Sequence, residues 1–321
     1  MTGRPIIAVP IGDPNGIGPE IAAAAARADG PARLLLVGSP LVIEHHAGGA
    51  TVRLVDATNL PAPAEATIDV VAVDAFAANN FLPGQCGAAS GRATVAYAAK
   101  ALDLAKGGHV QAVAACPHNE TAINAAGIPF SGYPSLVARL CSLREDEVFL
   151  MLVGGGLRIV HATLHERLAD ALARIDTALI ERAAVAARDA VVALGVDRPR
   201  IGLFGINPHA GENGLFGDDD DRATVPAAQA LRARGLDVAG PAGADLLLSE
   251  GACDVYVAAF HDQGHIPIKL LAGRDSAAMT IGAGILFASV GHGSAPDIAG
   301  KGIADPAPLM RTIRLLSGAS Q

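Results

Sequence analysis

Short apolar runs alternate along the chain with longer stretches in which apolar residues recur at helical spacing. Continuous runs of Ile, Val, Leu and Ala are typical of parallel strands buried on both faces, and their alternation with helices predicts an α/β fold with a largely parallel sheet. The predicted strands cover residues 6–9, 34–37, 68–73, 110–115, 148–153, 157–162, 201–206, 254–260 and 285–290. The predicted helices cover residues 19–28, 92–106, 133–141, 177–194 and 225–234.

Three of the predicted strands are followed by a polar segment that carries a histidine. These histidines are His165, His209 and His261. Open α/β sheets place their chemistry at the carboxyl ends of strands, and three neutral imidazoles can hold a divalent metal while leaving one coordination position open. A single histidine at a strand end is more often an ordinary hydrogen-bonded residue. The metal prediction therefore depends on the pattern occurring three times.

The length and charge of the chain limit the class of protein. With 321 residues it can form two lobes, and 51% hydrophobic but only 3% aromatic residues predict a core of Ala, Val, Leu and Ile. A net charge of −8 without a lysine or arginine cluster argues against nucleic acid or an anionic membrane as partner. No apolar stretch approaches the roughly 20 residues that span a bilayer. We expect the acidic run at residues 218–221 to be a solvated loop.

The cysteines are isolated along the chain. The four show no C-x-x-C spacing, which predicts buried thiols in a reducing compartment. No basic-then-apolar signal segment precedes the first predicted strand. A cytoplasmic location is therefore expected. These cysteines are Cys86, Cys116, Cys141 and Cys253.

Two glycine-rich segments stand out. Residues 12–20 follow the first predicted strand and open the first helix, with Pro19 at a first helical position. Glycines at a helix N-terminus permit close approach of a ligand or of another chain segment. The segment is not G-x-G-x-x-G, and no acidic residue ends the second strand at the Rossmann distance, so the ordinary dinucleotide fingerprint is excluded.

The second segment, residues 291–305, closely resembles the adenosine-binding loop of the β-decarboxylating dehydrogenases, the isopropylmalate and isocitrate dehydrogenase superfamily. The resemblance implies an α/β fold of two lobes with the active site in the cleft. We expect residues 1–135 and 285–321 in lobe one, and residues 136–284 in a dimer-forming lobe two. A carboxylate at Asp297 would bind the adenosine ribose hydroxyls, which favours NAD over NADP. The implied cofactor-binding residues are His292, Gly293, Ser294, Ala295, Asp297 and Ile298.

Nearly the whole chain further resembles one branch of that superfamily, the PdxA family of 4-hydroxythreonine-4-phosphate dehydrogenases. The resemblance implies that His165, His209 and His261 bind the metal and that the active site lies at the interface of a homodimer. Zinc is expected from the all-imidazole set, with Mg²⁺, Mn²⁺ or Co²⁺ as alternatives. The matching segments are residues 12–20, 126–132, 207–212 and 261–264, together with Lys269.

The chain departs from the PdxA pattern at residues expected to lie near the phosphate group of the substrate. Glu120 replaces a lysine, and Ala278 and Phe287 replace an asparagine and an arginine that contact the phosphorylated substrate. Without the arginine the pocket lacks the charge-assisted bonds that a phosphate needs, and a more apolar pocket suits a ring. A further change is Tyr133-Pro134 in place of His-Thr. Residues 116–124, 130–136, 148–154 and 264–271 resemble more closely a subgroup, the cis-dihydrodiol dehydrogenases of terephthalate breakdown.

The subgroup resemblance implies NAD-dependent oxidative decarboxylation of 1,2-dihydroxy-3,5-cyclohexadiene-1,4-dicarboxylate to protocatechuate. Lys269 would contact a carboxylate of the substrate, with a solvent-facing lysine at a strand end as the alternative. Asp245 and Asp262 would orient histidines or relay a proton, with capping or loop hydrogen bonds as the alternative. Tyr133 and Phe287 would wall the ring, with ordinary core packing as the alternative.

Two other functions stay open at this point. A PdxA-like dehydrogenase of a phosphorylated hydroxy acid needs a phosphate clamp that the sequence does not show. A non-redox metal hydrolase or lyase could use the same three histidines, but it leaves residues 291–305 unexplained. A binding or scaffold protein is the least supported, because it gives no reason for polar histidines at three strand ends.

Overall fold

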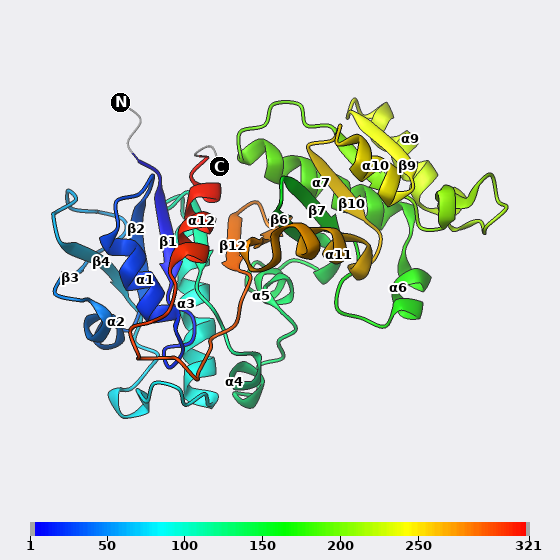
Figure 1. Cartoon of the computed structure of the whole chain (residues 1–321). Coiled ribbons are helices and arrows are strands. Elements are labelled where there is room, and N and C mark those ends of the chain that lie inside the picture. Colours follow the sequence, from blue (N-terminus) through cyan, green and yellow to red (C-terminus); the bar gives the residue numbers. More distant parts are fainter. Residues whose placement is uncertain (1–3, 319–321) are drawn as a thin grey trace. The chain divides into compact units, whose positions relative to one another are not determined.

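A computed structural model describes residues 4–318, and the chain divides into two compact units. Unit 1 contains the described residues up to Gly132 and from Ile285 onward, and unit 2 is Tyr133–Gly284. In Figure 1 the blue and cyan segments and the red C-terminal helix belong to unit 1, whereas the green to light-orange segments belong to unit 2. The chain thus leaves unit 1 once and returns to it.

Unit 1 is built on a parallel sheet in the order β3-β4-β2-β1-β5-β12. Helix α3 packs against β1, β2 and β5, and α12 packs against β5 and β12. The strands are β1 Ile6–Pro10, β2 Arg33–Gly38, β3 Thr51–Leu54, β4 Thr67–Ala72, β5 Ala112–Ala115 and β12 Leu286–Val290. The helices are α1 Gly18–Arg27, α2 Pro40–His46, α3 Ala88–Lys106, α4 Glu120–Ala125 and α12 Ala307–Leu316, with a 3-10 turn η1 at Ala78–Asn80.

The strands of unit 2 pair in the order β11-β6-β7-β10-β8-β9. Strand β6 is antiparallel to both of its neighbours, and the other pairs are parallel. The strands are β6 Phe149–Gly154, β7 Leu157–His161, β8 Ile201–Phe204, β9 Val238–Ala242, β10 Val255–Ala258 and β11 Ala277–Ile281. The helices are α5 Tyr133–Leu140, α6 Leu168–Arg174, α7 Thr177–Ala193, α8 Asp219–Arg222, α9 Thr224–Ala233, α10 Ala244–Glu250 and α11 His261–Ala272. Three 3-10 turns are η2 Glu145–Glu147, η3 Pro208–Gly211 and η4 Gly273–Asp275.

One face of the unit 2 sheet packs against α11. Side chains two residues apart on a strand point to the same face, so Leu150 and Leu152 of β6 share a cluster with Ile159 of β7 and Ile268 of α11. His161 lies two residues beyond Ile159, and β6 pairs it directly with Leu150. The imidazole of His161 therefore points to the face that α11 covers.

The prediction of an α/β fold with a largely parallel sheet is confirmed. Three strands were not predicted: β3 is short and partly exposed, β9 carries Gly240 and Pro241, and β11 was not recognised as a run. Residues 261–265 were expected only as a polar segment after a strand, but they begin helix α11. The two-lobed arrangement of the isopropylmalate dehydrogenase type stays a prediction.

Candidate functional site

The three predicted histidines follow neighbouring strands at one edge of the unit 2 sheet. Strand β10 lies between β7 and β8 and is parallel to both, so the carboxyl ends of all three strands meet at the same edge. His165 lies four residues beyond the end of β7, and His261 begins α11 soon after β10. The edge is the expected one for chemistry in an open α/β sheet.

A pocket at this edge brings together two of the three predicted histidines. It has a volume of about 350 Å³ and is lined by residues of the β7–α6 segment and of the start of α11. The ring centroids of His165 and His261 lie 5.6 Å apart. The volume is that of a pocket for a small molecule. The lining residues are Thr163, Leu164, His165, Glu166, Leu168, Ala171, Phe260, His261 and Asp262.

His209 lies in the turn η3 and has an exposed side chain. Its φ of 54° is left-handed, and so are the φ angles of Ala210, Glu212 and Asn213, a strained conformation that non-glycine residues rarely adopt. The ring packs against Phe216 at a centroid distance of 6.1 Å. Among residues 4–318, no three His, Cys, Asp or Glu side chains lie close enough to hold a metal ion. One chain by itself therefore does not supply the expected three-histidine site.

The backbone that leads to His209 is held by a buried carboxylate. Asp220 is 1% exposed and accepts hydrogen bonds from the backbone N–H groups of Ile206 at 2.8 Å and Asn207 at 2.9 Å. The hydroxyl of Thr224 donates to the same carboxylate. The prediction that residues 218–221 form a solvated loop was wrong for Asp220, because a buried carboxylate needs several donors and the turn before His209 supplies them.

Asp262 orients His261. Its Oδ1 lies 2.7 Å from Nδ1 of His261, so the Nδ1–H group donates to the carboxylate and Nε2 is left to bind a metal or a ligand. Asp245, the other predicted orienting residue, lies in the first turn of α10 with an exposed side chain. Within residues 4–318 the structure gives Asp245 no contact with a histidine.

Two further histidines lie beside His261, and sequence reasoning did not assign either to the site. His161 is 1% exposed, and its Nδ1 lies 3.2 Å from the carbonyl oxygen of Leu150. His265 Nδ1 lies 2.9 Å from His161 Nε2, and the His265 ring stacks on that of His261 with centroids 3.6 Å apart. Burial lowers the pKa of His161 to about 3 and that of His265 to about 4. The signal that could have revealed His265 is the spacing of residues 261, 265 and 269, which share one helix face.

Lys269 lies on helix α11 and not at a strand end, and its side chain is exposed, so the solvent-facing part of the alternative agrees with the structure. Its Nζ donates to the hydroxyl of Ser276 at 2.8 Å, and burial lowers its pKa. The ammonium group keeps two further N–H donors, which can bind a carboxylate.

The other substrate predictions fall on buried or half-buried side chains. Phe287 of β12, in unit 1, is 1% exposed, and Tyr133 of α5, in unit 2, is 4% exposed. Exposure this low is typical of core side chains. Ala278 of β11 packs against the unit 2 core, and Glu120 begins α4 with an exposed side chain.

Glycines bring a loop close to the carboxyl end of β1 in unit 1. The N–H group of Ile17 donates to the carbonyl oxygen of Ser294 at 2.9 Å, and a Cβ at Gly16 would lie 2.7 Å from the Cβ of Ser294. A Cβ at Gly12, where φ is +71°, would lie 2.2 Å from the carbonyl oxygen of Pro117. At these positions the glycine-rich segment makes room for other parts of the chain rather than for a ligand.

The predicted cofactor loop of unit 1 has both buried and exposed residues. Ser294 is 4% exposed, whereas the carboxylate of Asp297 is exposed. The imidazole of His292 is half-buried and contacts the carbonyl oxygen of Gly293 at 3.2 Å. An exposed carboxylate can accept hydrogen bonds from two neighbouring hydroxyl groups, so Asp297 fits the ribose of NAD. The other predicted members are Ala295, which has a φ of 40°, and Ile298, which is half-buried.

The prediction of four buried thiols was wrong for three of them, and within residues 4–318 none of the four cysteines is part of a disulfide. Cys116 is buried, Cys141 and Cys253 are half-buried, and Cys86 is exposed. Partial burial still raises the pKa of Cys86 to about 11, so its thiol is protonated at neutral pH.

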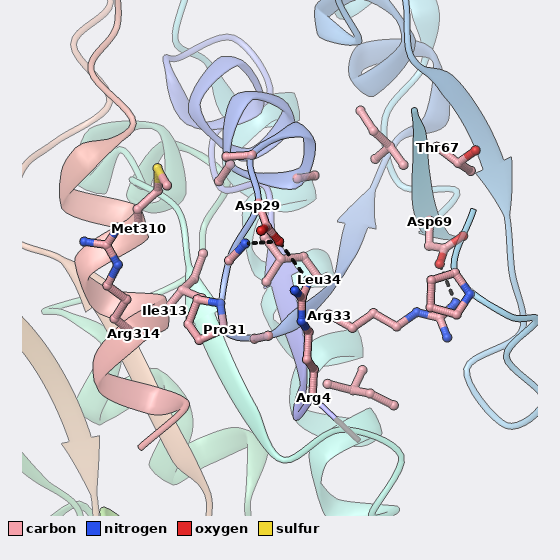
Figure 2. Close-up of a pocket in the computed structure, with 18 of the residues that line it drawn as sticks. Arg4, Asp29, Pro31, Arg33, Leu34, Thr67, Asp69, Met310, Ile313 and Arg314 are labelled. Atoms are coloured by element: carbon pink, nitrogen blue, oxygen red, sulfur yellow. Dashed lines mark hydrogen bonds and ion pairs between the residues drawn. The ribbon is translucent and has the colours of Figure 1, made fainter. Parts of the chain in front are cut away.

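A larger pocket, of about 490 Å³, lies elsewhere in unit 1 (Figure 2). None of the predicted site residues lines it. It lies at the amino ends of β1, β2 and β4, where Arg33 pairs with the buried carboxylate of Asp69 and Arg4 pairs with Asp29. Chemistry in open α/β sheets occurs at the opposite, carboxyl ends. We therefore place the candidate site at the smaller, histidine-lined pocket of unit 2.

A membrane-spanning helix would have to be long and apolar, and no helix within residues 4–318 meets both conditions.

The fold and the site define an α/β protein with a histidine-rich edge, and comparison with known proteins gives its family. The model of the family described as pyridoxal phosphate biosynthetic protein PdxA matches residues 31–316. The chain belongs to this family. A 1,2-dihydroxy-3,5-cyclohexadiene-1,4-dicarboxylate dehydrogenase from a Comamonas species is 47% identical over 311 residues, which cover 97% of this chain and 96% of that protein.

Two solved structures extend the comparison. A terephthalate 1,2-cis-dihydrodiol dehydrogenase from Burkholderia xenovorans is 52% identical, with 98% of each chain covered and a TM-score of 0.79. A 4-hydroxythreonine-4-phosphate dehydrogenase from Klebsiella pneumoniae is 34% identical, with 98% of each chain covered and a TM-score of 0.87. Sequence identity and backbone similarity rank these two relatives differently, so the fold does not decide the substrate. The chain is an enzyme, an oxidoreductase of the dehydrogenase type.

Proposed function

We propose that the protein catalyses the NAD-dependent oxidative decarboxylation of a cis-dihydrodiol carboxylate, 1,2-dihydroxy-3,5-cyclohexadiene-1,4-dicarboxylate, to protocatechuate. The observation that carries the proposal is the 47% identity over nearly the full length to the Comamonas enzyme of that name. The residues where the PdxA pattern has a phosphate clamp support it, because Ala278 and Phe287 offer no charge to a phosphate.

The chemistry is balanced by NAD alone. Bound NAD supplies the hydride acceptor for C2 of the diol. Oxidation transfers the hydride of C2 to NAD and releases the proton of the C2 hydroxyl group, which gives a β-keto acid. When carbon dioxide leaves C1, the electron pair of the broken bond forms the C1=C2 double bond of an aromatic catecholate. The catecholate oxygen takes up one proton, so the proton released in the first step is balanced. The role of Lys269 is to bind a carboxylate of the substrate, and that of Asp297 is to bind the ribose hydroxyls of the cofactor.

The metal is a separate part of the proposal. Of the three predicted metal ligands, the described residues of one chain bring together two, His165 and His261. No step of the reaction is therefore assigned to a metal. We propose that His209 of a second copy completes the site. His209 is exposed and its ring packs against Phe216, and Leu215 and Phe216 are 71% and 47% exposed. Exposed apolar side chains of this size indicate a surface that another chain covers.

Exposed apolar side chains on two helices of unit 2 also support a homodimer. Helix α11 exposes Ile266, Leu270 and Leu271, and α6 exposes Leu168 and Leu172. Helix α6 follows His165, and α11 begins with His261, so these apolar residues lie on the elements next to the predicted metal ligands. A dimer that buries them would place a second chain close to both histidines.

Mixed dimers of two inactive variants test the shared site. In a dimer of one His209→Ala chain and one His261→Ala chain, a site shared between chains leaves one site intact, whereas a site within one chain leaves none. Random mixing should therefore restore about a quarter of the wild-type activity, since half of the dimers are mixed and one of their two sites is complete. Mixtures as inactive as the separate variants would contradict the shared site.

The alternative is a dehydrogenase of a phosphorylated hydroxy acid, favoured by the TM-score of 0.87 to the Klebsiella pneumoniae enzyme. Comparing kcat/KM for the dihydrodiol and for 4-phosphohydroxythreonine, with NADH formation as the readout, separates the two. We expect the dihydrodiol to be preferred and Lys269→Ala to lower its kcat/KM by about 10²-fold, as when one partner of a charged pair is removed. A preference for the phosphorylated substrate would replace the first proposal by the second.

Restoring the asparagine and arginine of the PdxA pattern at Ala278 and Phe287 would be a poor test of substrate preference, because Phe287 is 1% exposed. An arginine there would be buried without an anion and would destabilise unit 1 before it affected specificity. Ala278→Asn is the milder change, since Ala278 is half-buried.

A further inference from the structure

The hydrogen bonds around His161 determine which of its ring nitrogens carries the proton. A carbonyl oxygen can only accept, so His161 Nδ1 donates to Leu150 across a distance of 3.2 Å. In a neutral imidazole the other nitrogen, Nε2, is then unprotonated and can only accept. The tautomer of His161 follows from the backbone of β6.

The same logic continues to His265. Its Nδ1 lies 2.9 Å from His161 Nε2, so His265 Nδ1 must donate. An imidazole with the ordinary pKa of about 6.5 is mostly neutral at pH 7.5, the pH of the first test below. The Nε2 of His265 therefore carries a free lone pair. We call the series Leu150 carbonyl, His161 and His265 the histidine relay.

The chain makes room for this relay with a glycine. A Cβ at Gly264 would lie 2.5 Å from His161 Nε2 and 2.9 Å from Cγ2 of Ile159. At these distances an added Cβ would force His161, Ile159 or helix α11 to move, and a shift of His161 or of α11 would disturb the contact between the two imidazoles. The sequence of α11 is thus compatible with the relay only because residue 264 is glycine.

His265 lies between two residues of the proposed site. Residues 261, 265 and 269 are four apart on α11 and lie on one face of the helix. The ring of His265 stacks on His261, and Lys269 is close enough to act electrostatically on His265. An acceptor at 265 and a cation at 269 would match a molecule that carries a hydroxyl group beside a carboxylate.

We propose that His265 determines substrate specificity by accepting, at Nε2, a hydrogen bond from the C1 hydroxyl of the diol, whose C1 carboxylate Lys269 binds. This inference rests on the proposed dihydrodiol function and adds a residue to it. A site built to bind a hydroxyl group discriminates strongly against an analogue that lacks it, because the acceptor is then left unpaired. His161 acts through His265 and is a positioning residue.

The first test reads the tautomer directly and needs no substrate. Two-bond ¹H–¹⁵N correlation spectra of the purified full chain, with ¹⁵N-labelled histidine, distinguish protonated from unprotonated ring nitrogens. The signals of His265 are assigned from their loss in His265→Gln. We expect a protonated Nδ1 and an unprotonated Nε2 in His265 at pH 7.5. A protonated Nε2 would overturn the proposal.

The second test measures binding of two ligands in the absence of NAD, so that no turnover occurs. The ligands are the diol and an analogue that lacks only the C1 hydroxyl. His265→Leu should weaken binding of the diol about 10-fold, the effect of one hydrogen bond, and leave the analogue unaffected. His265→Gln keeps an acceptor on a side chain of similar reach and should restore most of the loss. His109→Leu, the same change in a loop of unit 1, is the control and should alter neither affinity.

The outcomes separate this inference from the proposed function. Equal losses for the diol and the analogue in His265→Leu would mean that His265 only packs, and the hydroxyl contact would be overturned while the function stands. A wild-type protein that oxidises 4-phosphohydroxythreonine and does not bind the diol would contradict the proposed function. It would also contradict the hydrogen bond between His265 and the diol.

Discussion

The carboxyl ends of the parallel strands are built differently in unit 1 and in unit 2. The unit 2 edge presents side chains: His165 and His261 line its pocket, and the histidine relay lies beside them. At the unit 1 edge the close contacts involve the backbone: glycines bring the segment after β1 against the carbonyl oxygens of Ser294 and Pro117. The comparison teaches that side chains form the contacts described at the unit 2 edge, whereas backbone atoms form the close contacts described at the unit 1 edge.

The two edges should therefore respond differently to substitution. A side chain such as His261 can be shortened without disturbing the strand before it, so activity should fall while the fold remains. At Gly12 or Gly18 an added methyl group would meet a backbone oxygen, at 2.2 Å from Pro117 or 2.1 Å from Ile11. Backbone atoms cannot move aside as a flexible side chain can, so stability should fall instead.

The largest expected effect concerns the unit 2 edge. His261→Ala should lower kcat/KM by on the order of 10³-fold or more while the melting temperature changes little, because the edge acts through its imidazoles. A chelator should have the same effect on the wild type, and Zn²⁺ should reverse it. The measurements are NADH formation and metal content, with His109→Ala as the control. Normal turnover of His261→Ala would show that the imidazole of His261 has no role in the reaction.

The next effect concerns the unit 1 edge. Gly12→Ala should lower the free energy of unfolding by about 3 kcal/mol, because it combines a left-handed φ with a contact to the backbone of Pro117. Gly108→Ala is a matched control, since Gly108 has the same φ of +71° but no atom within 4 Å of the added Cβ. It should cost about 1 kcal/mol, the strain alone. Equal losses in urea denaturation would mean that the contact with Pro117 contributes nothing.

This contrast also explains what the sequence could predict. Apolar runs identified β7, β8 and β10 and the histidines that follow them, because strands buried on both faces are short continuous runs of apolar residues bounded by polar or turn residues. The relay of His161 and His265 could not be predicted, because it depends on how α11 lies against β7. That packing is set by Gly264 and Ile268, and neither gives a local signal of a contact 104 residues away.

Burial was the other property that the sequence concealed. The acidic run at residues 218–221 looked solvated, but Asp220 is buried because the turn after β8 offers it two backbone N–H groups. Phe287 of β12 is 1% exposed, which favours ordinary core packing, the alternative to a wall of the substrate pocket. In both cases a neighbour distant in sequence decides the environment, and composition carries no record of it.

A third prediction concerns the cofactor loop of unit 1, the one place at that edge where a side chain is expected to act. Asp297 should bind free ribose hydroxyls and repel a 2′-phosphate, so NAD should exceed NADP in kcat/KM by about 10²-fold, or roughly 2.7 kcal/mol. Asp297→Lys should narrow that ratio. Equal use of both cofactors by the wild type would mean that residues 291–305 have another role.

The smallest expected effect tests whether the buried carboxylate of Asp13, at the unit 1 edge, lowers the stability of the fold. Asp13 is fully buried, its Oδ2 has no hydrogen-bond partner within residues 4–318, and burial raises its pKa. An ionised Asp13 therefore destabilises the fold at neutral pH, and Asp13→Asn should stabilise unit 1 by about 1 kcal/mol at pH 7.

The pH dependence of that gain follows from the direction of the shift. Because the pKa of Asp13 is higher in the folded chain than in the unfolded chain, the folded state binds the proton more tightly, and wild-type stability falls as the pH rises through the folded pKa. The advantage of Asp13→Asn should therefore be present at pH 7 and shrink as the pH falls through that pKa toward the ordinary value of 3.8. Melting curves of both proteins between pH 4 and pH 8 measure it. An advantage independent of pH would show that the gain comes from packing and not from the removal of a buried charge.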